Sequence, residues 1–183
     1  MGMGSWGTAF GMVLADAGND VMLCGRDAEL TATINQAHHN PKFHPGIDLP
    51  VGLSATTDPR EALEQADLVV LALPAQTLRP NLLQWQPLLS DDCRIVSLIK
   101  GLEIGTLSRM SEVIADVASV EPQRVAVMSG PNLAREIALK QPSASVVACV
   151  EPELAELIQR TSQTTYFRPY TNVDVVGVEL GGV

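Results

Sequence analysis

Three glycines near the beginning of the sequence, Gly2, Gly4 and Gly7, have the GxGxxG spacing of a turn that binds the phosphates of a dinucleotide. In such a turn the first glycine permits a tight bend and the second lets the backbone approach a pyrophosphate. The third lets the following helix pack closely on the strand, and the helix directs its positive N-terminus at the phosphates. The spacing alone is weak evidence, and a glycine-rich loop of no function is the alternative. Here, however, a helix, a second strand and a ribose position follow at suitable distances.

A predicted strand over 21–24 is followed by Gly25, Arg26 and Asp27, at the place where a dinucleotide fold contacts the adenosine ribose. An acidic residue directly at the strand end would bind both ribose hydroxyls of NAD and repel the 2′-phosphate of NADP. Arg26 comes first instead, which favours NADP or tolerance of both cofactors. We expect Asp27 mainly to cap the next helix, with a ribose contact as the alternative.

Two further motifs follow predicted strands. Lys100 comes directly after the apolar segment 94–99, and the carboxyl ends of such strands face the ligand crevice. A lysine there can bind a phosphate, polarise a carbonyl or contact a nicotinamide, although a solvated lysine explains the spacing equally well. The turn at Ser129, Gly130 and Pro131 opens a helix whose free N–H groups could bind an anionic or carbonyl-bearing substrate. Taken alone, an ordinary strand–turn–helix junction is the better explanation of that turn.

Helices and strands alternate along the chain. The pattern predicts helices over 5–17, 28–37, 59–66, 76–89 with an interruption at Pro80, 106–118, 133–139 and 152–163, and strands over 21–24, 53–55, 68–73, 94–99, 125–128, 145–150 and 166–168. The longer strands lack polar alternation, which indicates a parallel sheet covered by helices on both faces. The predicted fold class is therefore α/β, a doubly wound, mostly parallel, Rossmann-like sheet. Because no strand stands before the glycine turn, we expect one upstream of Met1.

Composition excludes several classes of protein. The 183 residues are 46% hydrophobic and 18% charged, so there is ample apolar surface for a folded core. The net charge of −9 argues against a nucleic-acid partner, and no apolar run is long enough for membrane insertion, so we expect a cytoplasmic protein. We expect the three cysteines to be reduced and buried: Cys24, Cys93 and Cys149. The three histidines show no metal-ligand pattern: His38, His39 and His44.

The segments GMGSWGTAFG, NPKFHPGIDLP, LVVLALPAQTLR, SLIKGLE, SGPNLAREI and YTNVDVVGVELGGV, in this order, resemble the NAD(P)-dependent glycerol-3-phosphate dehydrogenases of the soluble bacterial type. The resemblance covers nearly the whole chain. It implies reversible reduction of dihydroxyacetone phosphate to sn-glycerol 3-phosphate with NADPH or NADH, a step that supplies phospholipid synthesis. It also implies a homodimer.

The resemblance assigns roles to single residues. It implies that the cofactor is contacted by the glycine turn and by Ser5, Trp6, Arg26, Phe43, Lys100 and Ala134. A hydrophobic plug under the loop is the alternative role for Phe43. The substrate would be contacted by Lys100, which thereby gains a catalytic role, and by Gly130 and Asn132. Many relatives carry a small hydroxyl residue at the position of Asn132, and an asparagine there can still donate a hydrogen bond.

The resemblance also divides the chain. It implies an NAD(P)-binding domain over 1–170 and, over 171–183, the start of a helical substrate domain. In the family the segment GVELGG continues into a lysine–asparagine pair whose lysine is the proton donor or acceptor. We therefore expect negligible turnover by these 183 residues alone.

Two other classes of function remain open. A ketopantoate reductase, or another reductase resembling 6-phosphogluconate dehydrogenase, would share the glycine turn but not SLIKGLE together with SGPNLAREI. A non-catalytic NADP-sensing module would need the glycine turn but would have no need for Lys100.

Overall fold

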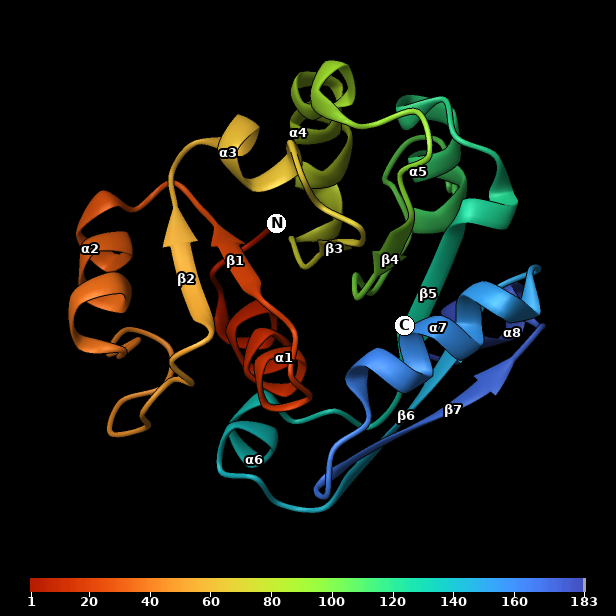
Figure 1. The fold of residues 1–183 in the computed structure, drawn as a ribbon. Helices are drawn as coiled ribbons and strands as arrows, with labels where there is room; N and C mark the ends of the chain where they lie inside the picture. The colour runs from red at the N-terminus through yellow and green to blue at the C-terminus, as the bar shows by residue number, and fades with distance from the viewer. Residues whose placement is uncertain (183) are drawn as a thin grey trace.

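The computed structural model describes residues 1–182 and shows helices on both faces of a twisted array of strands (Figure 1). The strands are β1 (Val21–Cys24), β2 (Leu53–Thr56), β3 (Val69–Leu71), β4 (Ile95–Ser97), β5 (Val125–Ser129), β6 (Ser143–Ala148) and β7 (Phe167–Asn172). The helices are α1 (Ser5–Asp16), α2 (Ala28–Ala37), α3 (Pro59–Leu63), α4 (Leu78–Trp85), α5 (Met110–Ala118), α6 (Ala134–Ala138), α7 (Pro152–Ser162) and α8 (Val175–Leu180). Three short 3-10 helices lie at Ala75–Thr77, Gln86–Leu88 and Pro122–Arg124.

The first two residues connect two sheets. β1 and β2 form a parallel pair, and the other five strands form a sheet in the order β3-β4-β5-β6-β7. Between β1 and β3, the amide of Gly2 donates to the carbonyl of Cys24 at 2.8 Å, and the amide of Ala72 donates to the carbonyl of Met1 at 2.9 Å. The backbone of Met1 and Gly2 therefore holds the two sheets side by side and leads directly into the glycine turn.

The predicted doubly wound α/β fold is confirmed, with one antiparallel pair in the sheet. β5 and β6 run antiparallel, with Met128 opposite Val147. The connection over 130–142 carries only the short α6, which packs on α1 instead of crossing the sheet. The chain therefore re-enters the sheet in the opposite direction.

Several predicted helices differ in their bounds from the observed ones, and two of the differences have a clear structural reason. The helix predicted over 106–118 begins only at Met110, because 102–109 form a loop closed by a bridge between Leu102 and Arg109. Pro80 does not interrupt its helix: it lies in the first turn of α4, where the missing N–H of a proline is tolerated.

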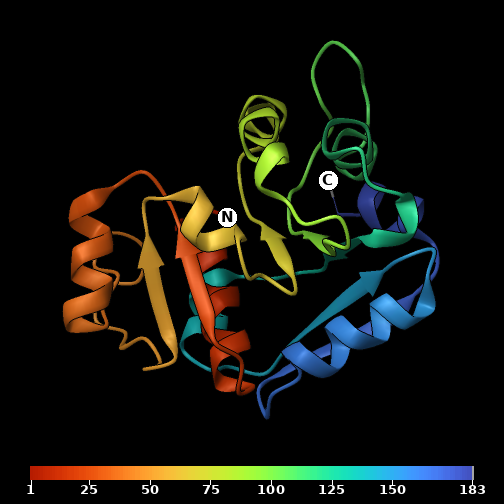
Figure 2. The same cartoon turned by 45° about the horizontal axis from the view of Figure 1, so that its top comes forward.

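Apolar side chains form two core clusters, one on each side of the sheet. One joins α1, α2, α6 and α7 and includes the edge-on pair Phe10 and Phe167, whose ring centroids are 6.0 Å apart. The other lies under α4 and α5 and includes Leu78, Met110 and Ile114. Figure 2 shows α4 and α5 on one side of the strands and α1 with α6 on the other. Because the strands are packed from both sides, their carboxyl ends are held at fixed positions, where the predicted functional residues follow them.

Candidate functional site

The three glycines of the turn have different surroundings. Gly2 has φ +117°, and a Cβ on it would lie 2.3 Å from the carbonyl oxygen of Ala72. A Cβ on Gly7 would lie 2.2 Å from the carbonyl oxygen of Gly2, whereas one on Gly4 would have no atom within 4 Å. Gly2 and Gly7 are therefore required by the packing of the backbone, while the space beside Gly4 is open to a ligand.

The N-terminus of α1 offers amide donors to that open space. Gly4 is the N-cap residue and provides no side-chain acceptor. The first intrahelical bond runs from the amide of Thr8 to the carbonyl of Gly4 at 2.9 Å, so the amides of Ser5, Trp6 and Gly7 precede the helical hydrogen-bond series. Donors of this kind, at the positive end of a helix, suit a phosphate. The Trp6 ring packs on Phe10, with ring centroids 5.8 Å apart, while its amide is one of these donors.

A loop over 38–50 is anchored to the glycine turn by two buried polar residues that sequence reasoning missed. The Nδ2 of Asn40, a fully buried residue, donates to Thr8 Oγ1 at 2.9 Å and to the carbonyl of Met3 at 3.4 Å. The Nε2 of His44, 1% exposed, donates to the carbonyl of Ser5 at 2.8 Å. No spacing or periodicity in the loop signals these long-range contacts.

Phe43 lies between these two anchors and is 37% exposed, so its ring is presented at the surface of the loop. It does not form a buried plug, which was the alternative role for this residue.

One basic and one acidic residue follow the end of β1, and their contacts differ. Arg26 is exposed, and within residues 1–182 it takes part in no salt bridge. The expected capping role of Asp27 is confirmed, since its Oδ1 accepts the amide of Leu30 at 3.1 Å. Its Oδ2 lies 3.0 Å from the ammonium of Lys42, and these two hydrogen bonds lower the pKa of Asp27.

Two motifs that are far apart in the sequence meet beyond β4 and β5. These strands are parallel neighbours, so their carboxyl ends lie at the same edge of the sheet. The exposed Lys100 follows β4, and its Nζ donates to the carbonyl of Gly130, after β5, at 3.2 Å. A lysine has three donors, so this bond leaves two for a ligand.

A serine that sequence reasoning missed orients Asn132. The Ser145 hydroxyl has a single hydrogen and donates it to the carbonyl of Ser129 at 3.0 Å. It must therefore accept from Asn132 Nδ2, which lies 3.0 Å away. This leaves Asn132 Oδ1 as a buried acceptor that no protein group among residues 1–182 satisfies. Ser145 reaches the turn only because β6 returns antiparallel to β5, which no local pattern indicates.

Ala134 is the first residue of α6 and is partly buried against the core cluster that also contains α1. This contact places it on the same side of the sheet as the glycine turn.

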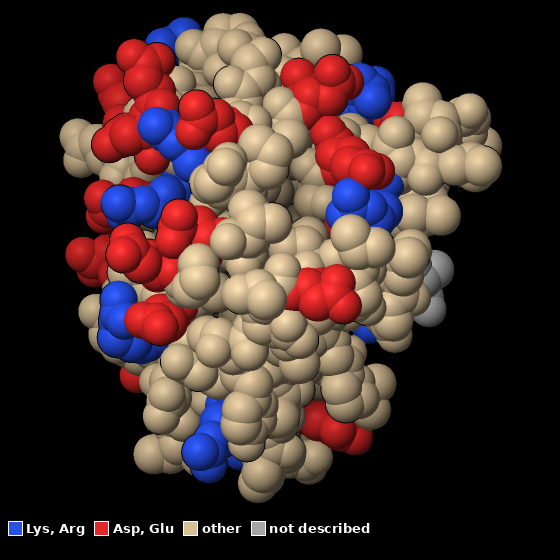
Figure 3. All heavy atoms as spheres, turned by 90° about the vertical axis from the view of Figure 1, so that its right-hand side faces the viewer, with Lys and Arg blue, Asp and Glu red and all other residues tan. Residues whose placement is uncertain are grey.

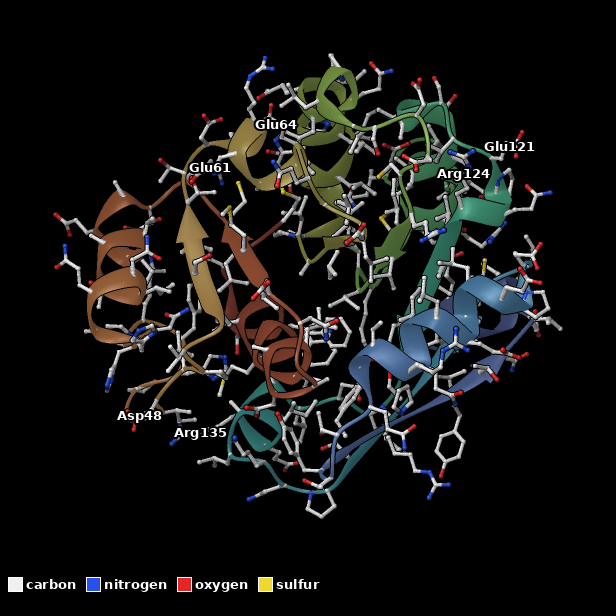
Figure 4. The ribbon with its side chains drawn as sticks, in the orientation of Figure 1. Asp48, Glu61, Glu64, Glu121, Arg124 and Arg135 are labelled. Carbon is white, nitrogen blue, oxygen red and sulfur yellow. The ribbon has the colours of Figure 1, made fainter. Side chains whose placement is uncertain are left out.

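A hollow of about 460 Å³ lies elsewhere, near the amino ends of β4 and β5. Its charged lining mixes three arginines and three glutamates: Arg94, Arg124, Arg160, Glu121, Glu151 and Glu153. Figure 4 shows Glu121 and Arg124 close to the chain that enters β5, and Figure 3 shows acidic and basic side chains interleaved on the adjoining face. Because these charges balance, this hollow does not have the positive lining that a phosphate ligand requires.

A doubly wound sheet with a glycine turn, an uncapped helix N-terminus and a lysine beyond a neighbouring strand defines a dinucleotide-binding domain of the dehydrogenase class. Residues 1–155 match the sequence profile described as the N-terminus of NAD-dependent glycerol-3-phosphate dehydrogenase, and the chain belongs to this family.

Individual relatives agree with the family match. The chain is 59% identical to the glycerol-3-phosphate dehydrogenase (NAD(P)+) of Streptomyces avermitilis over 99% of this chain and 54% of that protein. It is 53% identical to the protein of the same name from Corynebacterium aurimucosum, over 100% of this chain and 55% of that protein. The crystal structure of glycerol-3-phosphate dehydrogenase from Coxiella burnetii superimposes with a TM-score of 0.91 at 31% identity, over 99% of this chain and 55% of that one. The chain thus spans about half the length of the curated relatives it matches.

Among residues 1–182, no helix combines the length and apolar composition needed to cross a bilayer.

Proposed function

We propose that this chain supplies the cofactor site and part of the substrate site of an enzyme that interconverts dihydroxyacetone phosphate and sn-glycerol 3-phosphate with NADP(H) or NAD(H). The observation that carries the proposal is the contact of Lys100 with Gly130, because it unites two separate motifs of the family at one edge of the sheet. The family membership and the names of the relatives support it.

The residues of the glycine turn fit the pyrophosphate of the cofactor. The open space beside Gly4 admits the phosphates, and the first amides of α1 would donate to them. When bound, the nicotinamide supplies or accepts the hydride. Phe43 would lie beside the nucleotide and Ala134 near the cofactor, as the resemblance implies.

Lys100 and the turn after β5 would hold the substrate. The two remaining donors of the Lys100 ammonium would contact the carbonyl oxygen of the substrate and stabilise the negative charge that develops on it during reduction. The Asn132 Oδ1 acceptor, oriented by Ser145, would accept from a substrate hydroxyl. Gly130 keeps the turn narrow, since a Cβ there would lie 3.3 Å from the carbonyl oxygen of Ala144.

The reaction also needs a proton donor for the alkoxide. The relatives are nearly twice as long as this chain, and we assign the donor to the part of the enzyme that they contain in addition. The isolated chain is then expected to bind the cofactor weakly and to show negligible turnover. A homodimer in the cytoplasm that feeds phospholipid synthesis is the setting that fits this proposal.

Substitution of Lys100 tests the catalytic assignment against a non-catalytic NADP-sensing module. In a full-length enzyme containing this sequence, Lys100→Ala should lower kcat/KM for dihydroxyacetone phosphate by about 100-fold or more, because one preorganised donor to the developing oxyanion is lost. Arg135→Ala is the control, since Arg135 is an exposed cation on α6 near the periphery of the molecule (Figure 4). An unchanged rate in Lys100→Ala would remove the catalytic role. Absence of reaction with dihydroxyacetone phosphate in the unsubstituted enzyme would remove the substrate assignment.

A further inference from the structure

Two cations and one acid gather where β1 ends. Arg26 is exposed, and the Lys42 side chain is 58% exposed although its ammonium lies 3.0 Å from Asp27 Oδ2. The same ammonium lies 5.8 Å from the centroid of the Phe43 ring. Lys42 thus comes from a separate loop to the position where a dinucleotide fold contacts the adenosine ribose.

The position of Lys42 is determined by its neighbours in the loop. Asn40, two residues before it, is fully buried and bonded to Thr8 and Met3, and His44, two residues after it, is 1% exposed and bonded to Ser5. These anchors tie both sides of Lys42 to the glycine turn itself. The short segment between them is exposed, so the Lys42 ammonium is accessible to a ligand while the loop stays anchored on both sides.

Asp27 is poorly suited to bind the two ribose hydroxyls of NAD. One carboxylate oxygen accepts the amide of Leu30 at 3.1 Å and the other faces Lys42 at 3.0 Å. Both contacts lower the pKa of Asp27, so it remains a carboxylate. A ribose diol would have to compete with Lys42 for it.

The acids at the end of the neighbouring strand β2 are also engaged. Asp58 caps α3 by accepting the amide of Arg60 at 2.9 Å, and Glu61 accepts from the hydroxyl of Thr56 at 2.5 Å. In Figure 4, Glu61 lies beyond the end of β2. These carboxylates reduce the net positive charge of the region. Each cation beside the ribose position is therefore a large part of the charge that remains.

From this arrangement we propose that Lys42, together with Arg26, binds the 2′-phosphate of NADP(H), and that Asp27 holds Lys42 in place when no phosphate is present. This inference rests on the proposed function and deepens it, because it selects NADP(H) as the preferred cofactor. The two cations and Asp27 carry a net charge of +1, which attracts a 2′-phosphate and is indifferent to a 2′-hydroxyl. Removal of Lys42 would bring that charge to zero.

The test is a nucleotide titration of the 183-residue chain followed by amide NMR, which detects weak binding. NADPH is compared with NADH, and adenosine 2′,5′-bisphosphate with adenosine 5′-monophosphate. Lys42→Met should weaken the binding of NADPH and of the bisphosphate by about tenfold, which corresponds to the loss of one charge-assisted hydrogen bond. It should leave the binding of NADH and of the monophosphate unchanged. Lys140→Met is a closely matched control, because the Lys140 ammonium pairs with Asp16 at 2.8 Å and lies 5.8 Å from the Tyr166 ring, in another part of the molecule.

A second variant keeps the test independent of the folding of the first. Asp27→Asn retains a helix-capping side chain and removes the negative charge, so it should tighten NADPH binding several-fold and leave NADH unchanged. Equal weakening of both cofactors by Lys42→Met, or weaker NADH binding in Asp27→Asn, would overturn the assignment and show instead that Asp27 binds the ribose diol. If the unsubstituted chain binds neither cofactor, the proposed cofactor site fails, and this inference fails with it.

Discussion

Single residues determine how closely the backbone of the glycine turn approaches its neighbours. Gly2 and Gly7 each face a carbonyl oxygen at a distance that no Cβ can share, whereas Gly4 faces open space. A motif of three similar residues therefore contains two that serve the fold and one that serves the ligand. This division allows stability and binding to be separated by substitution.

Gly7→Ala should lower the free energy of unfolding by at least about 1–3 kcal/mol, because the new methyl would press on the carbonyl of Gly2. Gly4→Ala should lower it by less, about 1 kcal/mol or below, because alanine is a poorer N-cap residue than glycine, yet should weaken NADPH binding. Urea unfolding and the nucleotide titration measure the two effects. Equal effects of both substitutions on stability would contradict the division of roles.

Among the elements of the fold, the loop over 102–109 is held in place by contacts of a charged side chain. Glu103 accepts two hydrogen bonds from Arg79, at 2.8 and 3.1 Å, and one from the Thr106 hydroxyl at 2.7 Å. Arg79 first, and Thr106 second, lower the pKa of Glu103. The loop follows Lys100 directly, so its order contributes to the position of the site.

Acid should therefore loosen this loop. The lowered pKa means that the unfolded chain binds a proton at Glu103 more readily, so its stabilising effect is present above the ordinary glutamate pKa of about 4.3 and is lost as the pH falls through the lowered value. Arg79→Met should return the pKa of Glu103 toward its ordinary value and flatten this part of the stability profile. A carboxyl ¹³C NMR titration measures the pKa, and urea unfolding at several acidic pH values measures the stability. An unaltered Glu103 titration in the variant would show that Arg79 does not control it.

One acidic residue joins helix α8 to helix α5. Glu179 accepts from Arg109 Nη1 at 2.7 Å, from the amide of Ser111 at 2.8 Å and from the Ser111 hydroxyl at 2.5 Å. These bonds tie α8 to the N-terminus of α5. An element of six residues has little helical stability of its own, so tertiary contacts such as this one contribute to its order.

Glu179→Ala should speed amide hydrogen exchange in α8 by about tenfold or more, since charge-assisted bonds to Arg109 and Ser111 are lost. Exchange in β5 should stay unchanged. Glu156→Ala is the control, because Glu156 forms only an exposed pair with Arg160 at 3.6 Å. Equally fast exchange in both variants would show that Glu179 is not the anchor.

Over the whole molecule, the packing on both sides of the sheet encloses all three cysteines. Cys93 belongs to the cluster under α4 and α5 and Cys149 to the cluster with α1, while Cys24 is buried at the end of β1. Burial raises the pKa of each thiol, to about 11 for Cys93. The thiols therefore report on the opening of the whole fold.

In native buffer near pH 8 none of the three thiols should react rapidly with a thiol reagent, and all should react after denaturation. Because the pKa values are raised in the folded state, stability should fall as the pH rises above the unfolded cysteine value of about 8.5. Labelling followed by mass spectrometry of peptides distinguishes the three sites. Rapid native labelling at a single cysteine would reveal local opening at that position.

Local sequence patterns were sufficient for much of this protein. The strand over 21–24 and the helix over 28–37 were predicted with their observed bounds, and the doubly wound class followed from apolar strands alternating with helices. These features depend on neighbouring residues: side-chain periodicity, caps such as Asp27, and glycine spacing. For the same reason the glycine turn and the family resemblance could be read without a structure.

Tertiary structure alone decided which distant side chains meet. Asn40 reaches Thr8, Lys42 reaches Asp27, and Ser145 reaches Asn132 only because a loop folds over the glycine turn and β6 returns antiparallel to β5. Hydrogen bonds and ion pairs act over a few ångströms, and separation along the chain does not determine which groups come that close. The sequence by itself therefore determined the class of site, while the folded chain determined which residues orient and tune it.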